Sequence, residues 1–293
     1  MTGLSRRALL AALGLAGVSR ARAASPLRVA TLDWALLETL LALGVVPVAA
    51  AELVLYRRQV IEPAVPESVA DLGLRGSPSF EALKLLAPDL ILGSNYTAWA
   101  EPTLSRIAPV ESFSIYAPGG HPYAAAEAAT RAIASRLDMA PAGAALIALA
   151  DAEFAALKAR LTGGDGRPAL VINLGDDRHF RVFGADSMFG EALTCLGLAN
   201  AWRGSTRYSA TAPMGLETLA QVGDAWIALL PPVPPEARRM MAQSAFWKAL
   251  PSVRAGRIVE LAPVNPFGAL PAALRFARLL TDALPFAKAA ARG

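Results

Sequence analysis

Short apolar runs alternate with longer helix-compatible segments through the first half of the chain. The runs expected to form strands are residues 27–31, 47–51, 89–92 and 110–115. Each run has the length of a buried strand, and helix-compatible segments occur among them at 34–43 and 78–86. Strands that alternate with helices in this way predict a parallel α/β sheet with helices on its faces.

The middle of the chain departs from this alternation. Residues 123–161 are almost entirely compatible with helix, with one interruption before Pro141. Proline is favoured in the first turn of a helix, and the second part of the segment ends before Gly163 and Gly164. We therefore predict a long helix over residues 141–162.

The alternation of strands and helices resumes after this helix. The expected strands are residues 169–174, 181–183, 225–230 and 257–261. A final helix is expected over 269–284. The whole pattern predicts two α/β lobes bridged by a single long helix, with the first lobe at 24–140 and the second at 163–293.

The two lobes share a short sequence pattern. Glu81 lies in a predicted helix that leads into a strand beginning at Asp89, and Glu217 lies in one that leads into a strand beginning at Asp224. This unit occurs once on each side of the connecting helix, which favours two related lobes.

The first 23 residues have the features of an export signal. Arg6 and Arg7 precede a short apolar run at 8–18, and a small-residue cleavage site ends at Ala23. The run is too short to span a bilayer. The paired arginines indicate the twin-arginine export route, and an ordinary secretory signal that carries two arginines is the alternative. We expect the mature chain to be free in the periplasm.

Removal of this signal changes the charge balance. The whole chain has 28 Lys and Arg against 24 Asp and Glu, a formal net charge of +4. The signal contains four arginines and no acidic residue, so the mature chain is formally neutral. A neutral chain gives no indication of a basic surface, and we predict no nucleic-acid partner.

Residues suited to catalysis or metal binding are scarce. His121 and His179 are the only histidines, and Cys195 is the only cysteine, so no paired metal-ligand spacing and no intramolecular disulfide is available. Ser187 lacks the flanking glycines of a nucleophile elbow. We interpret the polar cluster at 176–179 as a turn between strands and Cys195 as a buried structural residue. The sequence predicts a binding protein, not an enzyme, with no catalytic residue and no metal site.

Seven short segments, spread in order over the mature chain, carry a family resemblance. They are residues 40–45, 62–69, 71–75, 107–109, 182–184, 200–202 and 253–257. Together they resemble the periplasmic ferric-hydroxamate siderophore-binding proteins that serve ABC importers. The resemblance implies two α/β lobes, one connecting helix and a ligand cleft between the lobes. It also implies a monomer, a ferric siderophore as ligand, an inner-membrane ABC permease as partner, and no cofactor, because iron arrives inside its chelator.

The resemblance further implies which residues bind the ligand. Arg75 matches an arginine that contacts hydroxamate oxygens in the family, and a guanidinium offers several fixed donors to such oxygens. Tyr96 matches a tyrosine whose hydroxyl donates to the ligand. The other family pocket positions correspond to Gln59, Ser209, Asn265 and Phe267, of which only Phe267 is aromatic. Trp99 and Tyr208 lie close in sequence to the expected pocket loops and are assigned to the pocket as well. Such a pocket has fewer aromatic rings than is usual in the family, which would suit a differently shaped or more polar siderophore.

Glu81 and Glu217 have a second implied role. In the wider family, one acidic residue on each lobe docks onto arginines of the membrane permease, and these two glutamates occupy the matching positions. The alternative is that each glutamate only complements the dipole of its helix.

Other functions are compatible with parts of this pattern. A corrinoid or haem would suit the same fold, although the scarcity of histidine argues against haem. An exported α/β hydrolase would need the nucleophile elbow that the sequence lacks. A sensor-associated or chaperone-like binding protein would differ only in its partner.

Overall fold

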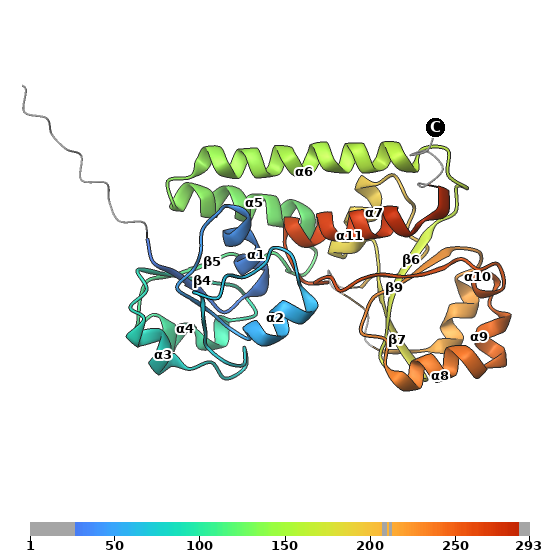
Figure 1. Cartoon of the computed structure of the whole chain (residues 1–293), viewed down its shortest axis with the longest axis horizontal. Helices are drawn as coiled ribbons and strands as arrows, with labels where there is room; N and C mark the ends of the chain where they lie inside the picture. The colour runs from blue at the N-terminus through green and yellow to red at the C-terminus, as the bar shows by residue number, and fades with distance from the viewer. Residues whose placement is uncertain (1–26, 207–209, 211–212, 287–293) are drawn as a thin grey trace, which may run out of the picture.

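A computed structural model describes residues 27–206, 210 and 213–286 of the chain. Two α/β lobes lie next to one another, and helix α6 (Ala140–Leu161) runs along one edge of both (Figure 1). The predicted two-lobe architecture with one long connecting helix is therefore confirmed. The export signal expected over 1–23 lies outside the described residues.

The first lobe is built on a parallel sheet, as predicted. Its strands are β1 (Val29–Thr31), β2 (Ala49–Ala50), β3 (Ala70–Asp71), β4 (Leu90–Gly93) and β5 (Val110–Ser112). They pair in the order β3-β2-β1-β4-β5, and every pair is parallel. The chain thus extends the sheet from β1 in one direction and from β4 in the other, so the strand order reverses between β1 and β4.

Short helices connect the strands of this lobe. They are α1 (Trp34–Ala42), α2 (Leu53–Gln59), α3 (Phe80–Leu85), the 3-10 helix η1 (Ala98–Ala100), α4 (Glu101–Leu104) and α5 (Pro122–Arg136). The predicted helices at 34–43 and 78–86 correspond to α1 and α3. Helix α2 and strand β3 were not predicted, because a helix of two turns and a strand of two residues are too short for a periodic signal.

The second lobe contains a mixed sheet, in which one strand runs antiparallel to its neighbours. Its strands are β6 (Ala169–Leu174), β7 (His179–Phe183), β8 (Met214–Gly215), β9 (Trp226–Leu229) and β10 (Ile258–Glu260). They pair in the order β10-β9-β6-β7-β8, and β7 is antiparallel to both β6 and β8. The reason is the short turn between β6 and β7, because a parallel connection needs a long crossover.

Helices cover the second sheet and close the molecule. They are α7 (Met188–Cys195), the 3-10 helix η2 (Leu216–Gln221), α8 (Pro235–Gln243), α9 (Ala245–Ala249), α10 (Pro251–Arg254) and α11 (Leu270–Ala283). The predicted final helix corresponds to α11. In Figure 1, α11 and α5 lie beneath opposite halves of α6.

One face of α6 is buried along its whole length. Its buried residues are Gly143, Ile147, Ala150, Phe154, Leu157 and Leu161, which recur every three or four positions. Of the helices within the described ranges, α6 alone is long and apolar enough to cross a membrane. Here it packs on α5 and α11 as the connector of the two lobes.

Candidate functional site

The carboxyl edge of the first sheet forms one wall of the cleft between the lobes. In open α/β sheets, ligands bind outside the carboxyl ends of the strands where the strand order reverses. The segments that follow β1 and β4 meet this condition and line a cavity of about 460 Å³, here named the sheet-edge pocket. It is lined by Leu32, Asp33, Trp34, Arg75, Gly76, Tyr96, Thr97, Trp99 and Phe267.

A second cavity, of about 490 Å³, lies between the lobes and is here named the inter-lobe pocket. Its first-lobe side consists of Leu55, Arg58 and Gln59 from α2. Its other residues are Asn173, Arg181, Phe183, Ala210, Leu230, Pro231, Pro232, Pro263, Val264, Pro266 and Phe267. Phe267 lines both cavities, so the two pockets meet at its ring.

Asp33 and Ser94 join the two loops of the sheet-edge pocket. Asp33 caps α1, where its Oδ1 accepts hydrogen bonds from the N–H groups of Ala35 and Leu36. Its Oδ2 accepts a hydrogen bond of 2.6 Å from Ser94 Oγ, which in turn accepts one from the Tyr96 N–H. The loop that carries Tyr96 is therefore tied directly to the end of β1.

Two contacts hold the guanidinium of Arg75 at the sheet-edge pocket. Its Nε donates to Glu52 Oε2 at 2.5 Å, and its central carbon lies 3.9 Å from the centre of the Trp34 ring. The Trp34 ring is fixed by a hydrogen bond of 3.0 Å from its Nε1 to the Ala51 carbonyl. Within the described residues, the terminal nitrogens of Arg75 form no hydrogen bond, so they can donate to a ligand.

Aromatic rings form a row across the cleft. Tyr96 and Trp99 follow β4 and are 48% and 54% exposed. Ring centres are 6.2 Å apart for Tyr96 and Tyr116, and 5.9 Å apart for Tyr116 and Phe267. Phe267 also lies 6.5 Å from Phe183 of the second lobe. Tyr116 and Phe183 are buried, so they support the row from within, while Tyr96 and Phe267 expose ring surface to a ligand.

The segment that carries Phe267 is supported by a buried carboxyl group. Glu38 accepts hydrogen bonds from Asn265 Nδ2 at 2.7 Å and from the Ala269 N–H at 2.9 Å. Asn265 Oδ1 accepts a hydrogen bond from the Phe267 N–H at 3.1 Å. Burial raises the pKa of Glu38 to about 8, and Asp33 adds to the increase, while the bonds from Asn265 and Ala269 oppose it.

The structure places five of the predicted ligand-binding residues on the walls of the cleft. They are Gln59, Arg75, Tyr96, Trp99 and Phe267. Asn265, in contrast, is buried and lines neither cavity, because its amide is engaged by Glu38. Its position supports Phe267 and keeps the amide away from a ligand. Tyr208 and Ser209 lie outside the described residues.

Sequence reasoning missed three polar residues of the inter-lobe pocket: Arg58, Asn173 and Arg181. Asn173 and Arg181 are directly paired across β6 and β7. The sequence contained a signal for Arg181, because polar and apolar residues alternate over 179–182, which is typical of a strand with one exposed face. Arg58 had no such signal, since it lies on α2, which the pattern did not predict.

The two glutamates expected to dock onto a permease are exposed in the structure. Glu81 lies in the first turn of α3, which is capped by Ser79 Oγ. Glu217 lies in the first turn of η2, which is a 3-10 helix. Neither residue lines either pocket of the cleft.

The other residues considered for catalysis or metal binding have structural roles. Residues 175–178 form the turn between β6 and β7, and Asp176 Oδ1 accepts hydrogen bonds from the N–H groups of Arg178 and of His179, the first residue of β7. Cys195 is partly buried against the core, and burial raises the pKa of its thiol. Within the described ranges, no group of three or more His, Cys, Asp or Glu side chains is arranged to hold a metal ion.

Comparison with known proteins identifies the class to which this fold and cleft belong. Residues 29–264 match the family model described as periplasmic binding protein. The chain therefore belongs to the periplasmic binding protein family, as the sequence segments indicated.

The chain is also similar to individual proteins of known ligand and to solved structures. The chain is 33% identical to the iron(3+)-hydroxamate-binding protein FhuD of Escherichia coli K12, over 97% of this chain and 99% of that protein. Its structure matches the siderophore-binding protein FhuD of Vibrio cholerae, solved with Fe³⁺–Desferal, with a TM-score of 0.83 and 28% identity over 89% and 98% of the two chains. The petrobactin-binding protein YclQ of Bacillus subtilis shares the fold, with a TM-score of 0.74 and 19% identity over 89% and 93%.

Proposed function

We propose that the protein is the periplasmic substrate-binding component of a ferric-siderophore ABC importer, with a hydroxamate siderophore as its favoured ligand. The observation that carries the proposal is the presence of Arg75, Tyr96 and Trp99 on the wall of one cavity. The printed descriptions of the Escherichia coli and Vibrio cholerae relatives support the same ligand class. Iron is the cargo and arrives already chelated, so the protein acts as a binder without a cofactor of its own.

Recognition of the chelate rests on hydrogen-bond donors and rings. The hydroxamate charges balance those of ferric iron, so the centre of the complex is neutral and carries electron-rich oxygens. The terminal nitrogens of Arg75 donate to these oxygens, while Glu52 neutralises the guanidinium. The Tyr96 hydroxyl supplies a further donor, and Trp99 packs against the carbon chain of the chelator.

Delivery to the membrane completes the proposed function. The protein is exported with a signal that ends near Ala23 and works as a monomer in the periplasm. Glu81 and Glu217 are exposed on separate lobes and are suited to pair with arginines of an inner-membrane permease. Both glutamates lie outside the cleft linings, so docking leaves the bound ligand in place.

Tryptophan fluorescence of residues 24–293 tests this function. The protein is titrated with ferric hydroxamates, ferric catecholates and ferric carboxylates, with metal-free chelators and a corrinoid as controls. We expect saturable quenching by a ferric hydroxamate, because Trp34 and Trp99 line the sheet-edge pocket. Quenching by no ferric complex, or by the corrinoid alone, would remove the siderophore assignment.

Substitution of Arg75 tests the binding mode. Arg75→Ala should weaken the binding of a ferric hydroxamate by about tenfold or more, because hydrogen bonds to a charged group contribute about 1.5–3 kcal/mol. The titration is repeated with Arg57→Ala, which removes an exposed arginine that lines neither pocket. Circular dichroism checks that both variants fold. Unchanged affinity in folded Arg75→Ala would exclude the assigned contact.

A further inference from the structure

The inter-lobe pocket carries positive charge that a neutral chelate does not require. Arg58 and Arg181 line it, and both side chains belong to exposed residues. Neither guanidinium forms an ion pair with a carboxylate in the part of the chain that the structure describes. Arg75 of the sheet-edge pocket differs in this respect, because it is paired with Glu52. The two halves of the cleft therefore have different electrostatic characters.

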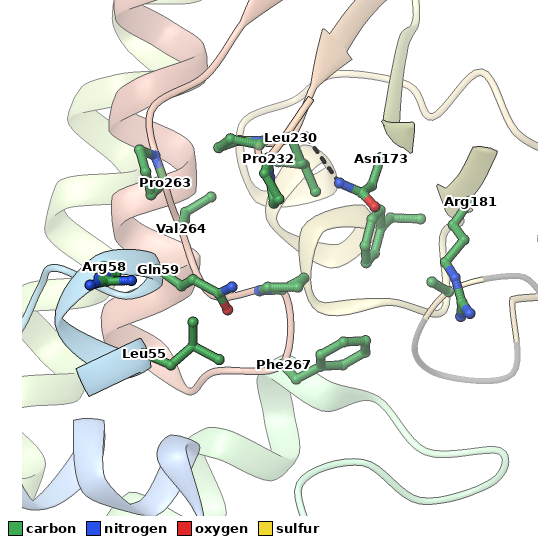
Figure 2. Close-up of a pocket in the computed structure, with 14 residues that line it drawn as sticks. Leu55, Arg58, Gln59, Asn173, Arg181, Leu230, Pro232, Pro263, Val264 and Phe267 are labelled. Carbon is green, nitrogen blue, oxygen red and sulfur yellow. Dashed lines mark hydrogen bonds between the residues drawn. The ribbon is translucent and has the colours of Figure 1, made fainter. Parts of the chain in front are cut away.

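The two arginines approach the pocket from different lobes. Figure 2 shows Arg58 on α2 and Arg181 on β7 at opposite ends of the cavity, with Gln59 and Phe267 between them. A ligand that occupies the cavity therefore comes within reach of a guanidinium at each end.

The cavity walls between the two arginines strengthen their attraction for an anionic ligand. They include Leu55, Phe183, Pro232 and Val264, and no carboxylate is among the described residues that line the cavity. Charges at a cleft with low-dielectric walls attract an oppositely charged ligand more strongly than charges on an open surface. Gln59 and Asn173 add polar groups that can bond to the uncharged parts of the same ligand.

From these observations we infer that the preferred ligand is a ferric hydroxamate siderophore whose periphery carries free carboxylate groups, bound by Arg58 and Arg181. This inference rests on the proposed function and names the ligand class within it. The neutral chelate centre lies against Arg75 and Tyr96, and the anionic periphery extends into the inter-lobe pocket. A siderophore with a free ammonium group is disfavoured, because it meets two like charges without a counter-ion.

Three forms of one chelate test the inference. Ferric desferrioxamine B is prepared with its terminal amine free, acetylated or succinylated, which gives a cationic, a neutral and an anionic complex with the same iron centre. We expect the succinylated form to bind the wild-type protein about tenfold more tightly than the amine form, because its carboxylate gains a charge-assisted hydrogen bond where the ammonium group meets like charges. The preference should decrease as salt is added, because ions screen exposed charges.

Variants connect this preference to the two arginines. The double variant Arg58→Gln, Arg181→Gln should lose the preference for the succinylated form and bind the acetylated form with nearly wild-type affinity. Arg57→Gln, which removes the neighbouring exposed arginine outside the pocket, should keep the preference. If the wild-type protein binds all three forms equally, or the double variant keeps the preference, the inference is wrong and the siderophore function stands. If no form binds, the proposed function fails with it.

Discussion

Glu38 combines complete burial with a position at the junction of the lobes. It lies on α1, and its carboxyl group accepts hydrogen bonds from Asn265 and Ala269, which lie on either side of Phe267 in the chain. Burial raises its pKa to about 8. The folded protein therefore holds a proton on Glu38 at neutral pH, whereas an exposed glutamate in the unfolded chain has released it.

The pH dependence of stability follows from this difference. From the ordinary value of 4.5 up to about 8, the folded state binds a proton that the unfolded state lacks. The free energy of unfolding contributed by Glu38 therefore falls as pH rises through this range and is level below and above it. Glu38→Gln removes the titration. We expect the stability of the wild-type protein to decrease relative to that of the variant by on the order of 3 kcal/mol between pH 5 and pH 8.

Urea denaturation of both proteins at pH 5 and pH 8 measures this effect. The comparison uses the change with pH in each protein, so a constant cost of the substitution does not affect the conclusion. Parallel decreases in the two proteins would show that Glu38 does not titrate in this range.

At the scale of elements, the contact between α5 and α6 depends on a glycine. A Cβ atom built at Gly143 would lie 2.5 Å from the Cβ of Ala134. The two helices can therefore approach closely only because residue 143 has no side chain. This contact holds the connecting helix against the first lobe, and α11 holds its other part.

The Gly143→Ala substitution tests this close approach. In an exposed helix the change would stabilise the protein, whereas here it should destabilise it by about 1–3 kcal/mol, because the added methyl group overpacks the contact. The double variant Gly143→Ala, Ala134→Gly moves the methyl group to the facing helix and should recover part of the loss. Ala144→Gly, at an exposed position of α6, measures helix propensity alone. Thermal unfolding of the four proteins distinguishes these contributions.

At the scale of the whole molecule, one of the hydrophobic clusters spans both lobes. The cluster includes Leu36 of α1, Ile133 of α5, Phe154 of α6, Phe189 of α7 and Phe276 of α11. The rings of Phe189 and Phe276 stack with centres 4.2 Å apart. Wide separation of the lobes would expose this core to water, so we expect the cleft to admit its ligand with only small lobe movements.

The surface outside the cleft carries the proposed docking residues Glu81 and Glu217, one on each lobe. The double variant Glu81→Ala, Glu217→Ala should bind ferric siderophore with unchanged affinity, since both side chains lie outside the cleft, and uptake of radiolabelled iron by cells should fall severalfold. Asp151→Ala serves as the control, because this exposed acidic residue lies on α6, at the opposite edge of the molecule from α3 (Figure 1). Full uptake by the double variant would contradict the docking role.

Much of the architecture was predictable because the sequence patterns that indicate its helices and strands are local. The buried strands β4 and β6 appear as short apolar runs, and α6 is bounded by a proline and a pair of glycines. These patterns depend on which face of each element is buried, so they can be recognised in a single sequence. The same reasoning identified the turn at 176–179, although not its consequence that β7 runs antiparallel to β6.

The site was predictable only in part. Motif matching pointed to Arg75 and Tyr96, and the structure places both on the sheet-edge pocket. The sequence did not show that the Asn265 side chain faces away from the cleft, because its hydrogen-bond partner Glu38 lies 227 residues earlier in the chain.

The sequence by itself determined the class of protein: its two lobes, the helix between them and the residue types suited to a chelated metal. Tertiary structure alone decided the character of the cleft, because it brought Arg58 of one lobe and Arg181 of the other to one cavity. Periodicity reports the burial of an element, whereas the charge of a pocket depends on side chains that meet across long separations in sequence. A local sequence pattern does not show which distant side chains come together in the folded protein.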